Sequence, residues 1–288
     1  MPSLYRGLLA ASAALLLAGC AHSLPRTPVA RTPVPPATDG DWRDFPVDRT
    51  PRPIVLLGPV AKHAGYTSDE AKVAAVSGNL RLDTPLPAFL PGPRPVALPD
   101  GTRELPLIGA QDAFAELCAH PDVKTVEQTT PLRITRVELG STTFATDRGQ
   151  VELPAWLFHP VDALGPIAWP AVGPEVFWRA GAVPPTTLGH AALDPDGRTV
   201  TVELPAPGPP CPGEPITRSE PVTTSTRETV TIALRTVPTG AVAHAEKGEC
   251  ISDMMLRTAR YPVTLDAPLG NRVLLGEQGG VYAVQVKR

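Results

Sequence analysis

The side chains best suited to covalent chemistry in this chain are its four cysteines, Cys20, Cys118, Cys211 and Cys250. A thiolate is both a nucleophile and a metal ligand, and two thiols can join in a disulfide. Cys20 follows two small residues, Ala18 and Gly19, at the end of an uncharged run. Its thiol is therefore the first candidate for a covalent modification.

The uncharged run before Cys20 predicts a signal peptide rather than a membrane-spanning helix. Residues 7–19 carry no charge and follow a short segment with one basic residue, Arg6. As a helix they would span roughly 20 Å at about 1.5 Å per residue, less than the ~30 Å hydrocarbon core of a bilayer. The length, the basic flank and the small residues before the cut are those of a signal peptide, expected over residues 1–19.

The end of this run resembles the lipobox of bacterial lipoproteins in Leu17, Ala18, Gly19 and Cys20. The resemblance implies that a diacylglyceryl group is joined to Cys20 through a thioether, that palmitate-type chains follow, and that cleavage makes Cys20 the first residue. Two or more acyl chains hold a protein stably, at ~0.8 kcal/mol per buried CH₂. We expect an extracytoplasmic chain, lipid-anchored to the bacterial cell membrane. An ordinary signal peptide with an incidental cysteine is the alternative.

Residues 20–53 are expected to form a tether between the lipid and the folded body. The segment is rich in proline, with Pro25, Pro28, Pro33, Pro35, Pro36, Pro46, Pro51 and Pro53. Proline lacks a backbone donor and favours extended, solvated conformations. Such a segment acts as a semi-rigid spacer.

The three cysteines beyond Cys20 allow three single disulfides, each leaving one thiol over. Disulfides persist outside the cytoplasmic membrane. Cys211 and Cys250 lie in polar, turn-like sequences that flank a strand pair, whereas Cys118 lies on the apolar face of a predicted helix. We predict the pair Cys211–Cys250, whose loop of about 40 residues contributes ~4 kcal/mol in the chain-entropy model.

The composition favours a folded, β-rich body. Proline (37 residues) and glycine (24 residues) limit long helices, while 42% apolar residues argue against disorder. The net charge is only −3 and no basic stripe is present, so nucleic acid is not expected as a partner. No later run is long enough to span a membrane.

Local patterns predict two helices, of which the first is less certain in type. Residues 67–78 carry a capping-box pattern from Thr67 to Glu70, although Val73 and Val76 leave a strand open. Residues 110–120 place their apolar side chains on one helical face. Residues 83–106 are rich in proline and are expected to be a surface connection.

Alternating apolar residues from Leu132 onward predict strands. Hairpins are expected around Asp147-Arg148-Gly149 and around Asp196-Gly197, with a further strand near residues 167–172. Residues 228–237 alternate, and three short strands are expected in residues 261–286. Turns every 8–12 residues or so are typical of a sandwich.

These patterns predict a mainly β fold, α+β overall. The expected domains are a signal peptide (1–19), a tether (20–53), a mixed domain with one or two helices (54–180) and an antiparallel, sandwich-like all-β domain (181–288).

Two segments of the body resemble uncharacterised secreted proteins and lipoproteins of high-GC Gram-positive bacteria. The first contributes Thr146, Gly149, Pro154, Ala155, Trp156 and Phe158, and the second contributes Val263, Thr264, Leu265, Pro268, Leu269, Gly270 and Arg272. The resemblance covers residues 105–288. It implies a fold and a secreted, cell-envelope compartment, supports the pair Cys211–Cys250, and implies no activity.

Three tryptophans, Trp156, Trp169 and Trp178, lie close together in sequence with two phenylalanines. One interpretation is an aromatic platform that binds carbohydrate or peptidoglycan strands. The favoured interpretation is a buried core, because aromatic side chains contribute much of the buried area of proteins. The three tryptophans nevertheless remain candidate ligand-binding residues.

The sequence does not favour a copper site. His244, Cys250, Met254 and Met255 are soft ligands, but the order of His before Cys is not that of blue-copper loops, and a disulfide would remove the thiolate. No metal and no cofactor are therefore predicted.

No nucleophile-elbow, zinc-protease or phosphate-loop motif occurs in the sequence. We expect a non-enzymatic binding or structural module at the cell envelope, attached to the membrane through Cys20. The alternative is an extracytoplasmic hydrolase whose catalytic residues are far apart in sequence. A cleft with a serine, a histidine and a carboxylate within hydrogen-bond reach would favour the hydrolase.

Overall fold

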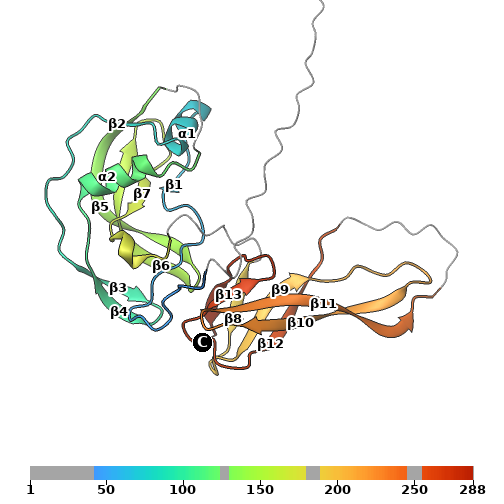
Figure 1. Ribbon diagram of the computed structural model, residues 1–288. Coiled ribbons are helices and arrows are strands. Elements are labelled where there is room, and N and C mark those ends of the chain that lie inside the picture. Colours follow the sequence, from blue (N-terminus) through green and yellow to red (C-terminus); the bar gives the residue numbers. More distant parts are fainter. Residues whose placement is uncertain (1–41, 124–129, 180–188, 245–254, 288) are drawn as a thin grey trace, which may run out of the picture. The chain divides into compact units, whose positions relative to one another are not determined.

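Strands dominate the computed structural model, which describes residues 42–123, 130–179, 189–244 and 255–287 (Figure 1). These residues lie in the unit Pro36–Arg288. The described residues form fourteen strands and two α-helices, so the prediction of a mainly β, α+β fold is confirmed. No helix among them is long and apolar enough to cross a membrane.

A five-stranded sheet supports both helices. In spatial order its strands are β1 (Lys62–His63), β7 (Ile167–Pro170), β6 (Gly149–Pro160), β5 (Leu132–Thr146) and β2 (Leu80–Leu82). Strands β5 and β6 form the long hairpin expected from the alternating pattern, with Thr146 opposite Gly149 across the turn. Gly149 has φ +91°, a conformation that residues with a Cβ rarely adopt, so the sequence terminates the turn with the residue it needs.

Helices α1 (Asp69–Val76) and α2 (Ala110–Ala119) confirm the two predicted helices. The N-cap of α1 is Ser68, whose hydroxyl accepts a hydrogen bond from the Ala71 amide at 3.1 Å, rather than Thr67. Small alanines of both helices pack with strand residues such as Trp156 and Phe158 in one core cluster. Cys118 of α2 is a half-buried free thiol, and burial raises its pKa.

The expected surface connection over residues 83–106 contains a hairpin instead. Strands β3 (Arg94–Leu98) and β4 (Gly101–Leu105) pair with each other and bury Val96 and Leu105 against the turn end of β5–β6. The segment Pro99-Asp100-Gly101 supplies the turn, with Gly101 at φ +120°. This short pattern of alternating apolar residues was not recognised in the sequence, because the residues on either side of it are rich in proline.

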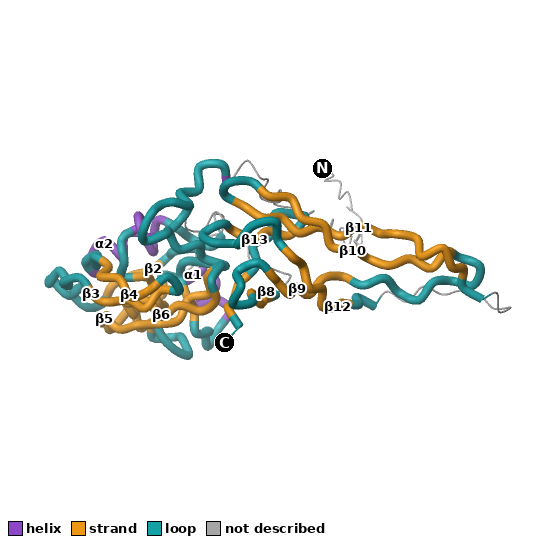
Figure 2. Tube along the Cα trace, turned by 90° about the horizontal axis from the view of Figure 1, so that it is seen from below, coloured by secondary structure: helices purple, strands orange, loops and turns teal. Residues whose placement is uncertain are grey.

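Two further sheets share a core, as a sandwich requires. One contains β10 (Pro215–Ser225), β11 (Thr229–Val242) and β13 (Val273–Gly276); the other contains β12 (Thr258–Thr264), β9 (Thr199–Pro205), β8 (His190–Leu193) and β14 (Ala283–Val286). Both sheets contribute to one apolar cluster that includes Val230, Ile232, Val200 and Val202. Figure 2 shows β10 and β11 running side by side. The two strands pair in antiparallel register.

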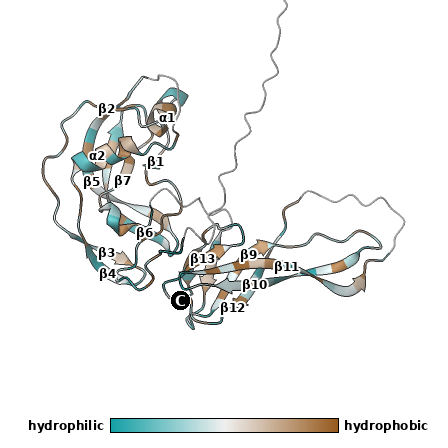
Figure 3. Ribbon diagram, viewed as in Figure 1, coloured by the Kyte–Doolittle hydropathy of each residue, from teal (hydrophilic) through white to brown (hydrophobic). Residues whose placement is uncertain are grey.

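The alternating pattern predicts a purely antiparallel sandwich, but the structure contains parallel strand pairs as well. Strand β13 pairs with β11 in parallel, and β14 pairs with β8 in parallel. Alternating apolar residues identify a buried face but carry no information about the direction of the neighbouring strand. Polar and apolar residues are mixed along these strands in Figure 3, as expected of sheets with one buried face.

Residues 42–53 belong to the folded body, although their prolines predict the end of the tether. Trp42 is 1% exposed and Phe45 is 2% exposed, and both pack with Val273 and Val281 in one cluster. The Phe45 ring contacts Trp42 and Trp178 edge-on, with centroids 5.9 and 5.4 Å apart. Large aromatic side chains offset the poor hydrogen-bonding capacity of proline here.

Several sequence-based predictions lie outside the described residues. These are the signal peptide, the lipidated Cys20, the tether up to residue 41, and both Cys250 and Met254. They stay predictions.

Candidate functional site

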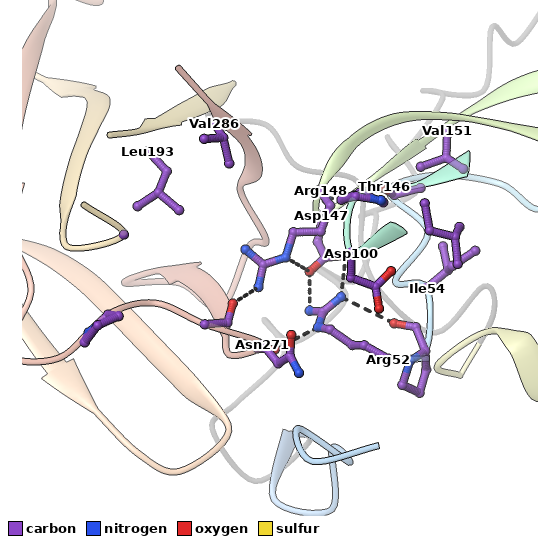
Figure 4. Close-up of a pocket in the computed structure, with 16 residues that line it drawn as sticks. Arg52, Ile54, Asp100, Thr146, Asp147, Arg148, Val151, Leu193, Asn271 and Val286 are labelled. Carbon is purple, nitrogen blue, oxygen red and sulfur yellow. Dashed lines mark hydrogen bonds and ion pairs between the residues drawn. The ribbon is translucent and has the colours of Figure 1, made fainter. Parts of the chain in front are cut away.

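A pocket of about 350 Å³ lies where three segments far apart in the sequence meet (Figure 4). The segments are Arg52–Ile54, the turn from Thr146 to Arg148, and the loop from Pro268 to Asn271. We call it the Arg148 pocket. Its volume is at the lower end of the range typical of small-molecule sites, about 300–1,000 Å³.

A buried ion pair forms the centre of the pocket wall. Arg52 binds both carboxylate oxygens of Asp147, with Nη1 donating to Oδ1 at 3.1 Å and Nη2 donating to Oδ2. The Arg52 and Asp147 side chains are only 7% and 2% exposed. A bidentate pair of this kind fixes orientation as well as charge, and removing one partner leaves a buried charge uncompensated.

Arg52 is held in place by three other groups, one of which is the Pro53 carbonyl, 3.3 Å from Nη1. Its Nε donates to the Asn271 carbonyl at 2.7 Å, and its guanidinium lies 4.7 Å from the centre of the Phe45 ring. Asn271 in turn donates from Nδ2 to the Val47 carbonyl at 2.8 Å. The buried N-terminal segment therefore positions one of the two arginines of the pocket.

Arg148 connects the β5–β6 turn to the loop before β13. Its Nη2 donates to the carbonyls of Gly270 at 2.7 Å and Arg272 at 2.8 Å. Its Nε lies 3.8 Å from Asp147 Oδ2. Burial is the main cause that lowers the pKa of Arg148 to about 10; the Arg52 charge adds to this, while Asp147 and Asp100 oppose it.

The backbone of the turn is fixed on both sides. The Asp147 amide donates to the Val55 carbonyl at 3.0 Å, and the Asp147 carbonyl accepts from the Val284 amide at 2.9 Å. The Thr146 hydroxyl donates to the Gly149 carbonyl at 2.8 Å and accepts from the Arg148 amide at 3.1 Å. The two charged side chains consequently start from a rigid backbone.

Apolar side chains flank the charged groups. Figure 4 shows Leu193 and Val286 on one side of the arginines, and Ile54 and Val151 on the other. Asp100, on the β3–β4 turn, is exposed to solvent at the edge of the pocket. The pocket thus offers mainly apolar walls with a polar, charged floor, which is the usual build of a small-molecule site.

The described residues of the pocket do not place a hydroxyl nucleophile beside a base. Among the described residues that line the pocket, Thr146 carries the only hydroxyl, and this hydroxyl is used within the turn. A nucleophilic site needs a nucleophile next to a base. Arg52 and Asp147 neutralise each other and are not free to transfer protons.

The three tryptophans proposed as a platform do not form one. Trp156 is fully buried and donates from Nε1 to the Ile108 carbonyl at 2.9 Å; its strand partner Trp169 is 7% exposed. Trp178 belongs to a different cluster, with Phe45 and Val273. The interpretation as carbohydrate-binding residues is wrong for Trp156 and Trp169, because the β6–β7 register places both inside the helix-covered core.

The predicted pair Cys211–Cys250 stays a prediction, because Cys250 lies outside the described residues. The same holds for the rejected copper ligands, Cys250 and Met254. Within the part of the chain that the structure describes, no group of three or more His, Cys, Asp or Glu side chains is arranged to hold a metal.

A second titratable group lies between β1 and α1. His63 Nδ1 and the Tyr66 hydroxyl are hydrogen-bonded, and His63 Nε2 lies 3.3 Å from Asp122 Oδ2, beside a cavity of about 660 Å³. This group of side chains bears on the hydrolase alternative. Burial and the Asp122 charge both raise the pKa of Tyr66, so the phenol is a poor nucleophile.

Arg52, Asp147 and Arg148 were not predicted from the sequence as site residues. Asp147 and Arg148 were predicted only as part of a hairpin turn. One signal was present. Both segments that carry the resemblance line the pocket, through Thr146 and through Pro268 and Gly270. Comparisons of the chain with protein-family models, with curated proteins and with solved structures found no match.

Proposed function

We propose that this protein is an extracytoplasmic binding module, anchored to the cell membrane by lipid on Cys20, that takes a small molecule in the Arg148 pocket. The observation that carries the proposal is the pocket itself. Its charged residues are fixed by the hydrogen bonds described above, and its walls are apolar. Such a surface is preorganised, so little conformational entropy is lost when a ligand binds.

The anchoring part of the proposal is supported by the lipobox-like residues Leu17–Cys20 and by the proline-rich segment after them. Residues 21–41 separate Cys20 from Trp42, the first described residue of the folded body. The proposed bridge Cys211–Cys250 fits an extracytoplasmic location, because disulfides persist there.

Palmitate labelling tests the anchor. In cells of a lipoprotein-processing bacterium, the wild-type chain is expected to incorporate labelled palmitate, and the Cys20→Ala variant is expected to incorporate none. Lipid transfer needs the Cys20 thiol, so Cys118→Ala serves as the matched control and should label like the wild type. Label retained by Cys20→Ala would refute the anchor.

Filling the pocket tests the binding part. The probe is 2-naphthalenemethanol, followed by its fluorescence with the chain from residue 20 carrying Cys20→Ala, which keeps every described residue. Val286→Trp places a bulky ring at the pocket wall and is expected to weaken binding by at least about tenfold.

Val222→Trp is the control for that measurement. Val222 is 37% exposed on β10 and does not line the pocket, so its substitution should leave the affinity for the probe unchanged. Equal affinity of Val286→Trp and the wild type would show that the probe, if bound at all, binds elsewhere, and the pocket would lose its proposed role.

A further inference from the structure

The Arg148 pocket contains a cationic group whose hydrogen-bonding capacity the described residues do not fill. A guanidinium carries five N–H donors. Arg148 uses Nη2 for the Gly270 and Arg272 carbonyls, and its Nε faces Asp147. Nη1 makes no hydrogen bond to any residue that the structure describes. Two N–H groups therefore remain for a ligand.

The positive charge of Arg148 is only partly compensated. Both oxygens of Asp147 are bound by Arg52, and the Arg148 Nε lies 3.8 Å from Asp147, beyond hydrogen-bond distance. Asp100 is exposed, so water and salt screen its charge. Burial is also the first cause of the lowered pKa of Arg148, and the charges of Asp147 and Asp100 oppose it only in part.

The apolar walls of the pocket indicate the chemistry of the rest of the ligand. Leu193 and Val286 lie on the side of the Arg148 guanidinium that faces away from Arg52 in Figure 4. A molecule that contacts them and also reaches Nη1 must carry an apolar body and an acceptor at one end. A carboxylate is the acceptor that best matches a guanidinium, through charge-assisted hydrogen bonds.

We propose that the Arg148 pocket binds a small carboxylate with an apolar body, which accepts hydrogen bonds from Arg148 Nη1 and packs against Leu193 and Val286. This inference rests on the proposed function and narrows its ligand to one chemical class.

A matched pair of probes tests the inference. 2-Naphthoate and 2-naphthalenemethanol share the same apolar body and differ in the charge of the end group. With the chain from residue 20 carrying Cys20→Ala, the carboxylate is expected to bind at least about tenfold more tightly than the alcohol, as a charge-assisted hydrogen bond provides.

Two arginine variants locate the preference. Arg148→Gln is expected to abolish the preference for 2-naphthoate over the alcohol, and its urea unfolding curve, compared with that of the wild type, shows that the chain is still folded. Arg148→Lys, which keeps the charge, should retain part of the preference. Arg260→Gln, an exposed arginine on β12, is the control and should behave like the wild type.

The possible results distinguish the carboxylate inference from the proposed binding function. Equal binding of both probes to the wild type, or a preference that survives in Arg148→Gln, overturns the carboxylate inference and leaves the binding pocket standing. Failure of both probes to bind overturns the proposed function together with the inference.

Discussion

Replacing Asp147 with alanine is expected to lower the free energy of unfolding by about 3–5 kcal/mol, the range for breaking a buried ion pair. The Asp147 side chain is 2% exposed and neutralises Arg52, which is 7% exposed. After the substitution Arg52 would stay buried without an anion, and Arg148 would lose its nearest carboxylate. Urea unfolding of the two chains measures the difference.

The control for Asp147→Ala is an ion pair on the surface. Asp48 pairs with Arg227, but both side chains are more than 70% exposed, so Asp48→Ala should change the stability by less than about 1 kcal/mol. A double-mutant cycle of Arg52→Ala with Asp147→Ala isolates the pair, with an expected coupling of roughly 1–3 kcal/mol. Equal losses from Asp147→Ala and Asp48→Ala would contradict the structural role of the cluster.

Trp42→Ala is expected to cost about 3–5 kcal/mol, the usual range for truncating a buried tryptophan. Trp42 is 1% exposed and packs against Phe45, whose ring in turn lies beneath Arg52. The loss of stability should therefore reflect both the cavity that the substitution leaves and the weaker packing of Arg52. Thermal or urea unfolding of the chain from residue 20 measures it.

Trp42→Phe provides the graded control. The indole Nε1 of Trp42 is buried without a hydrogen-bond partner among the described residues, so replacing it with phenyl removes no hydrogen bond. We expect Trp42→Phe to cost clearly less than Trp42→Ala. Should Trp42→Ala unfold like the wild type, residues 42–53 would be a solvated tether, as their proline content alone predicts.

Local patterns were sufficient to predict most strands and both helices. The β5–β6 hairpin follows from alternating residues on either side of Asp147-Arg148-Gly149, and α1 from the capping-box pattern of Thr67 and Glu70, although the N-cap is Ser68. These features depend on neighbours only a few residues apart, so the sequence carries them directly. The β3–β4 hairpin was missed because its alternation is short and its flanks are rich in proline.

The pocket could not be predicted from local sequence patterns. Arg52 and Asp147 are 95 residues apart, and Arg148 and Gly270 are 122 residues apart. An arginine near prolines and an aspartate in a turn look like ordinary surface residues when they are read locally. Their burial depends on which strands pair and in what register, and this follows from the packing of the whole chain.

The sequence by itself determined the strand-rich class and the positions of the main turns and helices. It also predicts that Cys20 carries a lipid. Each of these depends on short-range residue patterns or on a short processing motif. Only the tertiary structure decided that Trp156 and Trp169 are core, that Trp42 belongs to the body, and that two arginines and an aspartate share one buried site. The physical reason is that burial and charge pairing arise from contacts between distant segments, whose energies depend on the final packing and not on local order.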